Sequence, residues 1–494
     1  MTQEPKSHAR HCLLFLTLIA SLFCGYAATA KEAPVKVYIL AGQSNMVGIG
    51  QFTGGSKGWE GEFSGLELSN YPGSYDASVD YAAMQPTKVI PYENTQTARK
   101  ESLPQEGVNV LRGFIEMPES GVYEFKSGWA GSSHNIMRVD GQETYRKELD
   151  AKEATTTPVQ IKAGKKVPFE ITYLKTGGNM VGWFGRTDLP GTLQTVVLKE
   201  GKFPYLLDAE GNFAPRDDVW YRGVVTATGN QWLNYGCGGN AFSIGAELGF
   251  GHKVGDLHDE PVILLKTSQG NRSLGWDFLP PGSERFEFTD EAGVTWVHAG
   301  YKDTAERWVK GTEPTPIPWY GGKQYDECFD AAKDVLANFD KEFPQWADRG
   351  YEIAGFGWWQ GHKDGGQQGD GKAGPLATRY EHNLAHLIRT LRSEFNAPDA
   401  PFVVATCGFE GGEGWEPGSS ADTIFKAQMA VSDPVKYPEF AGNVMSVDIR
   451  PFYRPSEQSP RKQGFHYHGN AETYMLVGEA MGQAMLRLKC AESQ

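Results

Sequence analysis

The sequence is short of cysteine, of basic residues and of long apolar runs, and each shortage excludes a class of protein. Six cysteines occur in 494 residues and no two stand in Cys-x-x-Cys spacing, which argues against a structural zinc site. Lys and Arg number 47 against 61 Asp and Glu, and a net charge of −14 does not suit nucleic acid or an anionic membrane surface. Beyond the first 30 residues, no run is apolar enough to span a bilayer.

The first 30 residues have the pattern of a secretory signal peptide. Lys6 and Arg10 supply positive charge, Leu13–Phe23 is apolar, and Ala28-Thr29-Ala30 offers a small-x-small cleavage site. We predict cleavage after Ala30 and a secreted or periplasmic mature protein, with an uncleaved N-terminal anchor as the alternative. Such cleavage leaves four cysteines, which form either two disulfides in one of three connectivities or four buried free thiols.

A serine follows the first predicted strand of the mature chain. Val35–Leu40 is an apolar, β-branched run typical of a buried strand, Gly42 permits a sharp turn, and Ser44 comes two residues later. Ligands of open α/β sheets bind at the carboxyl ends of parallel strands, so Ser44 is a candidate nucleophile. The alternative is that Ser44 only caps a helix starting near Asn45. The spacing around Ser44 is not Gly-x-Ser-x-Gly, which excludes the α/β-hydrolase nucleophile elbow.

The order of strand-like and helix-like segments predicts an α/β protein with an all-β insertion. From Val219 onward, strand and helix patterns alternate, which predicts a doubly wound parallel sheet flanked by helices. Between 104 and 198, by contrast, short strand-like runs are separated by turns such as Asp-Gly, which indicates a β-sandwich. The predicted segments are a signal peptide at 1–30, the α/β domain at 31–103 and 199–494, and the insertion at 104–198.

Local composition and periodicity also predict the individual segments. We expect a loop region with short helices from Ser44 to about Thr97, because this stretch is rich in Gly, Ser, Tyr and Asn. Strands are expected at 262–265, 353–359, 402–405 and 444–447, and helices at 325–343, 380–391 and 472–488.

Three later stretches carry residues suited to chemistry. Ser243–Gly251 contains Gly245, whose simplest role is a turn before a helix. Gly357–Asp364 ends a predicted strand and contains Gln360, whose amide can donate a hydrogen bond to an oxyanion. Gly464–Glu472 leads into the last helix and contains two histidines.

The two histidines, His466 and His468, are candidate bases because imidazole titrates near neutral pH. His-x-His in extended chain places both rings on one side of a strand, so a zinc-like set with His362 and Asp364 is an alternative. A pair of polar side chains on one strand face, with no catalytic role, is a third interpretation.

Taken in order, Gly-Gln-Ser-Asn-Met at 42–46 and these three stretches resemble the four blocks of the SGNH hydrolases, and in particular the sialate O-acetylesterase and acetyl-xylan-esterase branch. The resemblance implies a flavodoxin-like sheet with Ser44 as the nucleophile. In that branch, the late histidine is followed by Glu after four residues and by Gly after ten. His468 meets this spacing through Glu472 and Gly478, whereas His466 does not.

The resemblance also implies an oxyanion site and a third member of a catalytic triad. The oxyanion would be held by the backbone N–H groups of Ser44 and Gly245 and by the side chain of Gln360. Two acids of the family pattern are replaced here, by His362 and by Phe465. The carboxylate that orients His468 is therefore open between two candidates, Asp364, which we favour because its loop lies near the site, and Asp448.

The implied function is that of a secreted serine esterase that removes O-acetyl groups from a carbohydrate, without cofactor or metal. The partner is an acetylated glycan or oligosaccharide, with no role for nucleic acid or membrane insertion. We assign substrate contacts to Trp358, Trp359 and Asn45. The alternatives are a glycan-binding protein on a degenerate esterase frame, and a metal-dependent hydrolase that uses His362, His466 and His468.

The predicted insertion has a resemblance of its own. The run Gly113–Phe125, the Arg-Val-Asp-Gly at 138–141 and the Ile-Lys-Ala-Gly-Lys-Lys-Val at 161–167 look like a PA14-type β-sandwich. Members of that family often bind carbohydrate, and a rigid spacer without a ligand is an equally good interpretation.

Overall fold

The computed structural model describes residues 32–53, 62–94, 98, 101–118, 120–126, 134–178, 180, 183–186, 189–226, 229–240 and 242–492. The predicted signal peptide and its cleavage site, at 1–30, lie outside these residues. Among the helices of the described part, none is long and apolar enough to cross a membrane.

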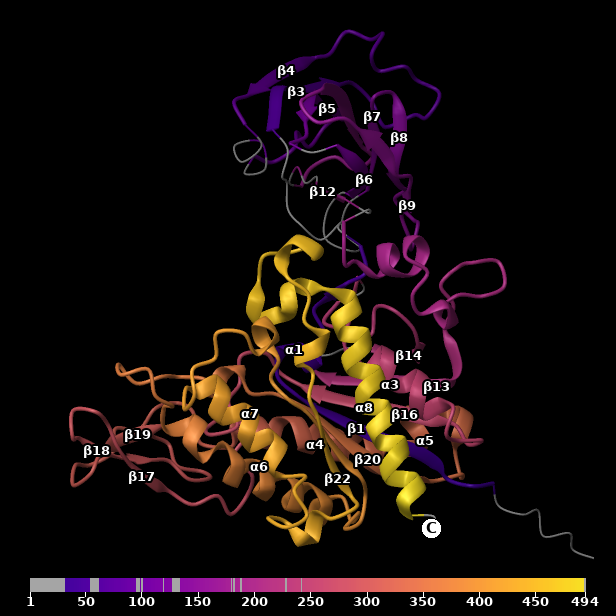
Figure 1. The fold of residues 1–494 in the computed structure, drawn as a ribbon. Helices are drawn as coiled ribbons and strands as arrows, with labels where there is room; N and C mark the ends of the chain where they lie inside the picture. The colour runs from indigo at the N-terminus through magenta and orange to yellow at the C-terminus, as the bar shows by residue number, and fades with distance from the viewer. Residues whose placement is uncertain are drawn as a thin grey trace, which may run out of the picture. The chain divides into compact units, whose positions relative to one another are not determined.

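A seven-stranded sheet forms the centre of the α/β part of the chain (Figure 1). In spatial order its strands are β14 (Gly229–Leu233), β13 (Arg216–Val225), β16 (Val262–Ser268), β1 (Val35–Gly42), β20 (Tyr351–Trp359), β21 (Phe402–Ala405) and β22 (Val444–Val447). All neighbouring pairs are parallel except β14 and β13, which are antiparallel at the edge. The prediction of an α/β class is confirmed.

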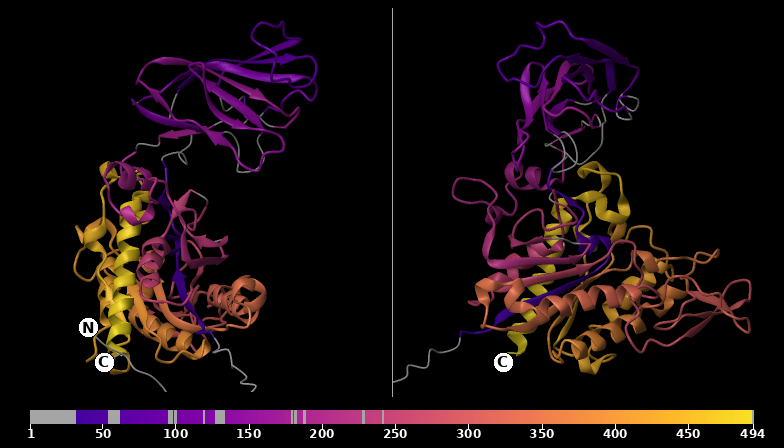
Figure 2. Two further views of the ribbon diagram at one scale, coloured as in Figure 1. Left: turned by 90° about the vertical axis from the view of Figure 1, so that its right-hand side faces the viewer. Right: turned by 180° about the vertical axis from the view of Figure 1, so that it is seen from behind.

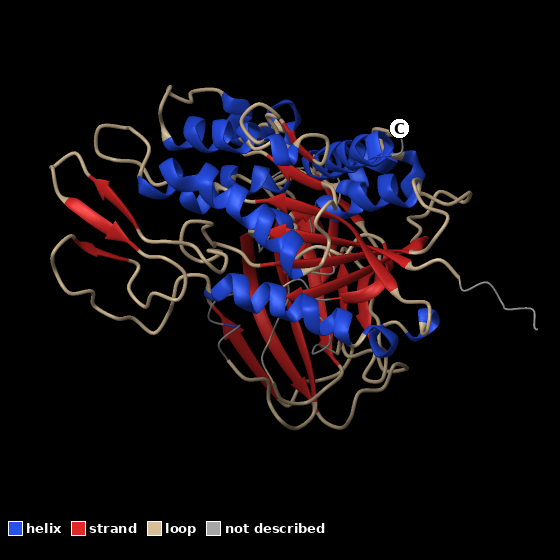
Figure 3. Ribbon diagram, turned by 90° about the horizontal axis from the view of Figure 1, so that it is seen from below, coloured by secondary structure: helices blue, strands red, loops and turns tan. Residues whose placement is uncertain are grey.

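Helices cover both faces of this sheet (Figures 2 and 3). On one face, α3 (Ala246–Gly255) packs against α8 (Ala471–Glu492), and on the other lie α4 (Lys323–Ala337), α6 (Pro375–Glu394) and α7 (Ser420–Ala430). Alternate residues of β1 enter the two cores. Because both faces are buried, the strand is apolar from Val37 to Ala41, and Lys36 near its start is the charged exception.

Two antiparallel sheets form the second part of the fold. The larger has the order β4 (Lys88–Tyr92), β3 (Glu62–Tyr71), β5 (Val108–Glu116), β11 (Lys166–Tyr173), β7 (Asn135–Val139), β8 (Gln142–Lys147) and β9 (Thr155–Thr156). The smaller has the order β10 (Val159–Ile161), β6 (Gly121–Lys126) and β12 (Trp183–Arg186). One apolar core contains residues of both sheets, among them Leu111, Phe125 and Ile171.

The antiparallel part starts earlier than the sequence suggested. The loop expected between Ser44 and Thr97 contains two long strands, β3 and β4, of the larger sheet. In β3 the pairing with β5 shifts register between Ser64 and Glu67, where Gly65 has a φ of 60°. This bulge interrupts the two-residue alternation by which a strand is recognised in sequence. At the other end, Leu193, Val196 and Val197 belong to the α/β core, not to the antiparallel part.

The remaining elements are short. They comprise the helices α1 (Ser44–Val47) and α5 (Phe339–Glu342), the strand pair β2 (Gly50–Gln51) and β15 (Ser243–Ile244), and a small sheet of β17 (Phe286–Thr289), β18 (Thr295–His298) and β19 (Arg307–Val309). Single turns of 3-10 helix occur at loops, and those named below are η4 (His362–Asp364) and η9 (Gly464–Gly469). Cys237, Cys328, Cys407 and Cys490 are all free thiols, which is the second of the two alternatives, except that Cys490 is exposed and not buried.

Candidate active site

Ser44 begins α1 at the carboxyl end of β1, where the chain turns sharply out of the sheet. Gly42 makes the turn possible, because its φ is +151° and a Cβ there would lie 2.1 Å from the Trp359 carbonyl oxygen. The Ser44 side chain is half-buried, and its Oγ lies 2.9 Å from Nε2 of His466. A serine and an imidazole at hydrogen-bond distance are the two groups that acyl transfer to a serine requires.

The imidazole beside Ser44 is that of His466, and not that of His468, the residue predicted to be the base. Both ring nitrogens of His468 are engaged elsewhere, Nδ1 with the Gln463 N–H at 3.0 Å and Nε2 with the Tyr453 hydroxyl at 3.0 Å. The two histidines diverge because Tyr467 and His468 have left-handed backbone conformations, with φ of 47° and 56°. The sequence interpretation relied on spacing to the last helix and could not detect this turn.

Neither predicted carboxylate orients a histidine. Asp364 is buried and accepts hydrogen bonds from the N–H groups of Leu274 and Gly275 at 2.9 and 2.8 Å and from Nε2 of Gln360 at 2.6 Å. Asp448 forms an ion pair with Arg450 at 2.7 Å. The Asp364 carboxylate, which was predicted to orient the base, bonds to these groups and to neither histidine, and it anchors the loop after β16 to the loop after β20.

The unused nitrogen of His466 has no partner among the described residues. Its Nδ1 is buried and makes no hydrogen bond. Burial, together with the nearby His362 and Arg461, lowers the pKa of His466 to about 4. Ser44 and His466 thus form a dyad whose imidazole is neutral at physiological pH and therefore able to accept a proton.

The two predicted oxyanion donors are also occupied. The Gly245 N–H donates to Oε1 of Glu247 at 2.7 Å. Nε2 of Gln360 donates to Asp364, to the Arg272 carbonyl and to Oε1 of Gln43, and its Oε1 accepts a hydrogen bond from the Tyr380 hydroxyl. Both predicted oxyanion donors, Gly245 and Gln360, therefore already have acceptors within the protein.

A different glycine, Gly270, lies against Ser44. A Cβ built on Gly270 would be 3.5 Å from Cβ of Ser44, so the loop after β16 passes beside the serine. In the described part of the chain, no hydrogen bond uses the backbone N–H of Gly270 or of Ser44. The Gly-Asn-Arg-Ser-Leu run at 270–274 was visible in the sequence, but it carried no signal that distinguished its glycine from that at 245.

The residues assigned to the substrate are structural. Trp358 and Trp359 are 0% and 2% exposed, because neighbouring residues of β20 point into the two opposite cores. Asn45 is buried too, where its Nδ2 donates to the Phe465 carbonyl at 3.2 Å and its Oδ1 accepts from the Tyr474 hydroxyl. Beside His466, the Phe465 side chain is 44% exposed, and its ring centroid lies 4.5 Å from that of the His466 ring.

The histidines do not assemble a metal site. His466 contacts Ser44 and His468 contacts Tyr453, and within the described ranges no three His, Cys, Asp or Glu residues are grouped so that they could hold a metal ion. The extended His-x-His geometry behind the zinc alternative is absent, since 464–469 forms η9 with its left-handed turn.

A buried ion pair bonds to the short helix that begins at Ser44. Lys266 of β16 and Glu247 of α3 are both fully buried and 2.9 Å apart. The Lys266 ammonium also donates to the carbonyls of Val47, at the end of α1, and Cys237 at 2.8 and 2.7 Å. The pair thereby ties the short helix that carries Ser44 to the sheet.

Replacing Lys266 by Met is expected to lower the free energy of unfolding by about 3–5 kcal/mol, because Glu247 would be left buried without its cation. Urea titration followed by tryptophan fluorescence measures the change. The matched control is Lys310→Met, which breaks the exposed pair with Glu287 and should cost about 1 kcal/mol or less. Equal effects of the two substitutions would contradict a supporting role for the buried pair.

The chain was compared with known families, curated proteins and solved structures. No protein-family model matches the sequence, and no curated protein matches it. Among solved structures, a carbohydrate acetylesterase from Xanthomonas citri is 12% identical with a TM-score of 0.35, covering 79% of this chain and 73% of its own. A protein from Arabidopsis thaliana is 15% identical with a TM-score of 0.33, covering 55% and 82%. NanS is 11% identical with a TM-score of 0.29, covering 94% and 100%. With TM-scores below 0.5, none of these likenesses assigns the chain to a family.

Proposed function

We propose that this protein is a serine esterase of SGNH type that removes O-acetyl groups from a carbohydrate. The observation that carries the proposal is the 2.9 Å contact between Oγ of Ser44 and Nε2 of His466 at the carboxyl end of a central parallel strand. The resemblance of the four sequence blocks to the sialate O-acetylesterase branch supports the carbohydrate ester as substrate, with a sialate-like sugar as one candidate. Export after cleavage at Ala30 is part of the same proposal.

The reaction follows from the dyad. Ser44 attacks the acetyl carbonyl while His466 takes its proton, and the sugar hydroxyl leaves with that proton. The negative oxygen of the tetrahedral intermediate would accept hydrogen bonds from the N–H groups of Ser44 and Gly270, which have no acceptor among the described residues. Water, activated by His466, then hydrolyses the acetyl-Ser44 ester.

The unpartnered Nδ1 of His466 gives weight to a second candidate, a glycan-binding protein on an esterase frame that has lost its acid. In a full triad, a carboxylate at this nitrogen fixes the tautomer and stabilises the imidazolium. A dyad lacks that stabilisation and is expected to be slower, but it retains a base in contact with the nucleophile.

The two candidates are separated by covalent labelling. A serine-reactive phosphonate should inactivate hydrolysis of p-nitrophenyl acetate and add one group to the peptide that contains Ser44, as read by mass spectrometry. EDTA should leave the rate unchanged. A protein that neither hydrolyses the ester nor reacts at Ser44 would be a binding protein, and loss of activity in EDTA with recovery in zinc would indicate a metal hydrolase.

The pH dependence tests the identity of the base. Since the pKa of His466 is lowered to about 4, the imidazole stays neutral until the pH falls close to that value. We expect kcat/KM for p-nitrophenyl acetate to be nearly constant from about pH 7.5 to about pH 5 and to decline only as the pH falls through about 4. Circular dichroism at each pH serves as the folding control. A decline centred near 6.5, the ordinary pKa of histidine, would contradict the assignment of His466.

A further inference from the structure

Phe465 presents an accessible aromatic ring directly beside the proposed base. It precedes His466 in η9, the centroids of the two rings are 4.5 Å apart, and the Phe465 side chain is 44% exposed although it is large and apolar. The reaction derived above gives this residue no role. Ligand sites are lined mainly by apolar and aromatic side chains, so a ring in this position is a candidate contact for the substrate.

The backbone and the ring of Phe465 are both held in place. The Phe465 carbonyl accepts a hydrogen bond from Nδ2 of the buried Asn45 at 3.2 Å, and Oδ1 of Asn45 accepts one from the Tyr474 hydroxyl. The Phe465 ring also packs against that of His362 of η4, with centroids 5.5 Å apart and planes inclined by 31°. A ligand that covers this surface therefore does not have to order a mobile segment.

His362 adds a polar edge to the aromatic surface. Its ring contacts those of Phe465 and, with centroids 5.3 Å apart, Phe409. Within the described ranges, neither ring nitrogen of His362 makes a hydrogen bond. Partial burial against these rings, together with the nearby charge of Lys363, lowers the pKa of His362 from its ordinary value. The imidazole is therefore uncharged at neutral pH and offers one donor and one acceptor.

The chemistry of the proposed reaction places the leaving group beside His466. The imidazole first takes the proton of Ser44 and then gives it to the oxygen of the departing alcohol, so this oxygen must come within hydrogen-bond distance of Nε2. The carbonyl oxygen of the ester, by contrast, faces the proposed oxyanion donors. A ring packed against the imidazole is thus placed to contact the alcohol part of the ester and not its acyl part.

We propose that Phe465 packs on the C–H face of the sugar ring of the substrate and thereby selects esters of pyranoses over esters of simple alcohols. The C–H face of a pyranose is apolar and fits a flat aromatic ring, and the polar rim of the sugar fits the donor and acceptor of His362. This role rests on the proposed function, because the sugar is the alcohol that the same reaction releases. Phe465 takes the place of Trp358 and Trp359, which are buried, as the aromatic contact of the substrate.

The test compares esters that differ in one part only. Ethyl acetate and glucose pentaacetate share the acyl group and differ in the alcohol, whereas ethyl acetate and ethyl butyrate share the alcohol and differ in the acyl group. Aryl esters are avoided, because their leaving group would itself stack on Phe465. Acid release is followed in a pH-stat at about pH 7.5, where the imidazole of His466 is neutral.

Phe465→Ala should lower kcat/KM for glucose pentaacetate about tenfold, mainly by raising KM, and should change kcat/KM for the two ethyl esters less than about twofold. Phe465→Trp, which restores a flat aromatic ring, should keep at least about a third of the wild-type kcat/KM for the sugar ester. Phe465→Leu keeps an apolar side chain without a flat ring and should lose nearly as much as Phe465→Ala. It decides the outcome if thermal unfolding shows that Phe465→Ala is not folded.

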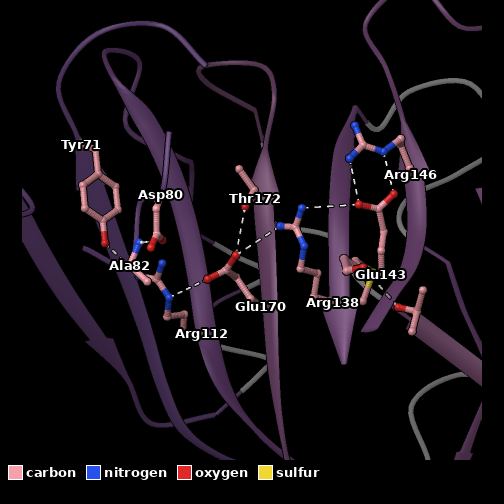
Figure 4. A network of polar contacts seen from close by, with 11 residues as sticks. Tyr71, Asp80, Ala82, Arg112, Arg138, Glu143, Arg146, Glu170 and Thr172 are labelled. Carbon is pink, nitrogen blue, oxygen red and sulfur yellow. Dashed lines mark hydrogen bonds and ion pairs between the residues drawn. The ribbon is translucent and has the colours of Figure 1, made fainter. Parts of the chain in front are cut away.

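The matched control is Phe114→Ala. Phe114 of β5 is 45% exposed, much as Phe465 is, but it lies in the larger antiparallel sheet. The charged residues beside it, Arg112, Glu170 and Arg138, pair with one another (Figure 4). Loss of this ring should leave the hydrolysis of all three esters unchanged.

Three results would contradict the role of Phe465. They are an unchanged rate of Phe465→Ala on glucose pentaacetate, an equal loss on ethyl acetate, which would mean that the ring only supports His466, and a loss that follows the acyl chain from acetate to butyrate. In each case the wild-type chain still hydrolyses esters, so the proposed function stands. A wild-type chain that hydrolyses none of the three esters overturns the proposed function and the role of Phe465 with it.

Discussion

Ser44→Ala is expected to lower kcat for p-nitrophenyl acetate by roughly four to six orders of magnitude. The hydrolysis that remains would be the direct attack of water on the ester, with His466 as general base. In the proposed mechanism the acetyl group is transferred to the serine oxygen, and no other side chain supplies a nucleophile at that position. KM should change little, because the side chain contributes to the transition state and not to a binding pocket. Initial rates with excess enzyme measure the loss.

The fold should survive this substitution. Ser44 Oγ makes one hydrogen bond, with His466, and removing it is expected to cost about 0.5–1.5 kcal/mol. Ser432→Ala is the matched control, because that half-buried hydroxyl also makes one hydrogen bond, 2.9 Å from the Met429 carbonyl, far along the chain from the site. If Ser44→Ala keeps more than a tenth of the wild-type rate, ester hydrolysis takes place elsewhere and the proposed mechanism is wrong.

The second large effect distinguishes two histidines that stand two residues apart. His466→Asn should lower kcat by roughly three to six orders of magnitude, since no base would remain on Ser44. His468→Asn should cost less than about tenfold, because His468 bonds to Tyr453 and to the Gln463 N–H and does not contact the nucleophile. Asparagine is used at both positions because it tolerates the left-handed backbone at 468.

Phosphonate labelling of Ser44 gives a second measurement of the same contrast. The labelling rate depends on proton removal from Ser44 and should decrease in the His466 variant alone. Added imidazole should partly restore hydrolysis in His466→Ala, an effect that a purely structural residue would not show. If His468→Asn instead caused the larger loss, His468 would be the base, as the spacing of the family predicts.

The absence of an acid at His466 has a physical consequence for rate and for pH. A carboxylate at Nδ1 would raise the pKa of the imidazole and stabilise its protonated form in the transition state. With Nδ1 buried and unpartnered, the pKa falls to about 4 instead, so the base is available over a wide pH range but is a weaker proton acceptor. The buried Asp364, whose pKa burial raises to about 7, serves the loop that carries Gly270 and not the histidine.

The sequence by itself determined the parts of this protein that depend on local pattern. Strands predicted at 402–405 and 444–447 have those bounds, and the α/β class followed from alternating strand and helix patterns, because side chains buried on both sheet faces must be apolar in sequence. The apolar run before Ser44 likewise predicted that this serine follows a buried strand. A strand was missed where a bulge at Ser64–Glu67 breaks the two-residue period.

Only the tertiary structure decided which polar groups meet. His466 and not His468 contacts Ser44 because two left-handed residues turn the chain between them, and no period or spacing encodes that turn. Gly245 and Gln360 have the right identity for oxyanion donors, but Glu247 and Asp364, two and four residues further along the chain, already accept their hydrogen bonds. A polar group in a folded protein pairs with a partner that is near in space, and the backbone conformation that brings the two together is not visible in the sequence spacing.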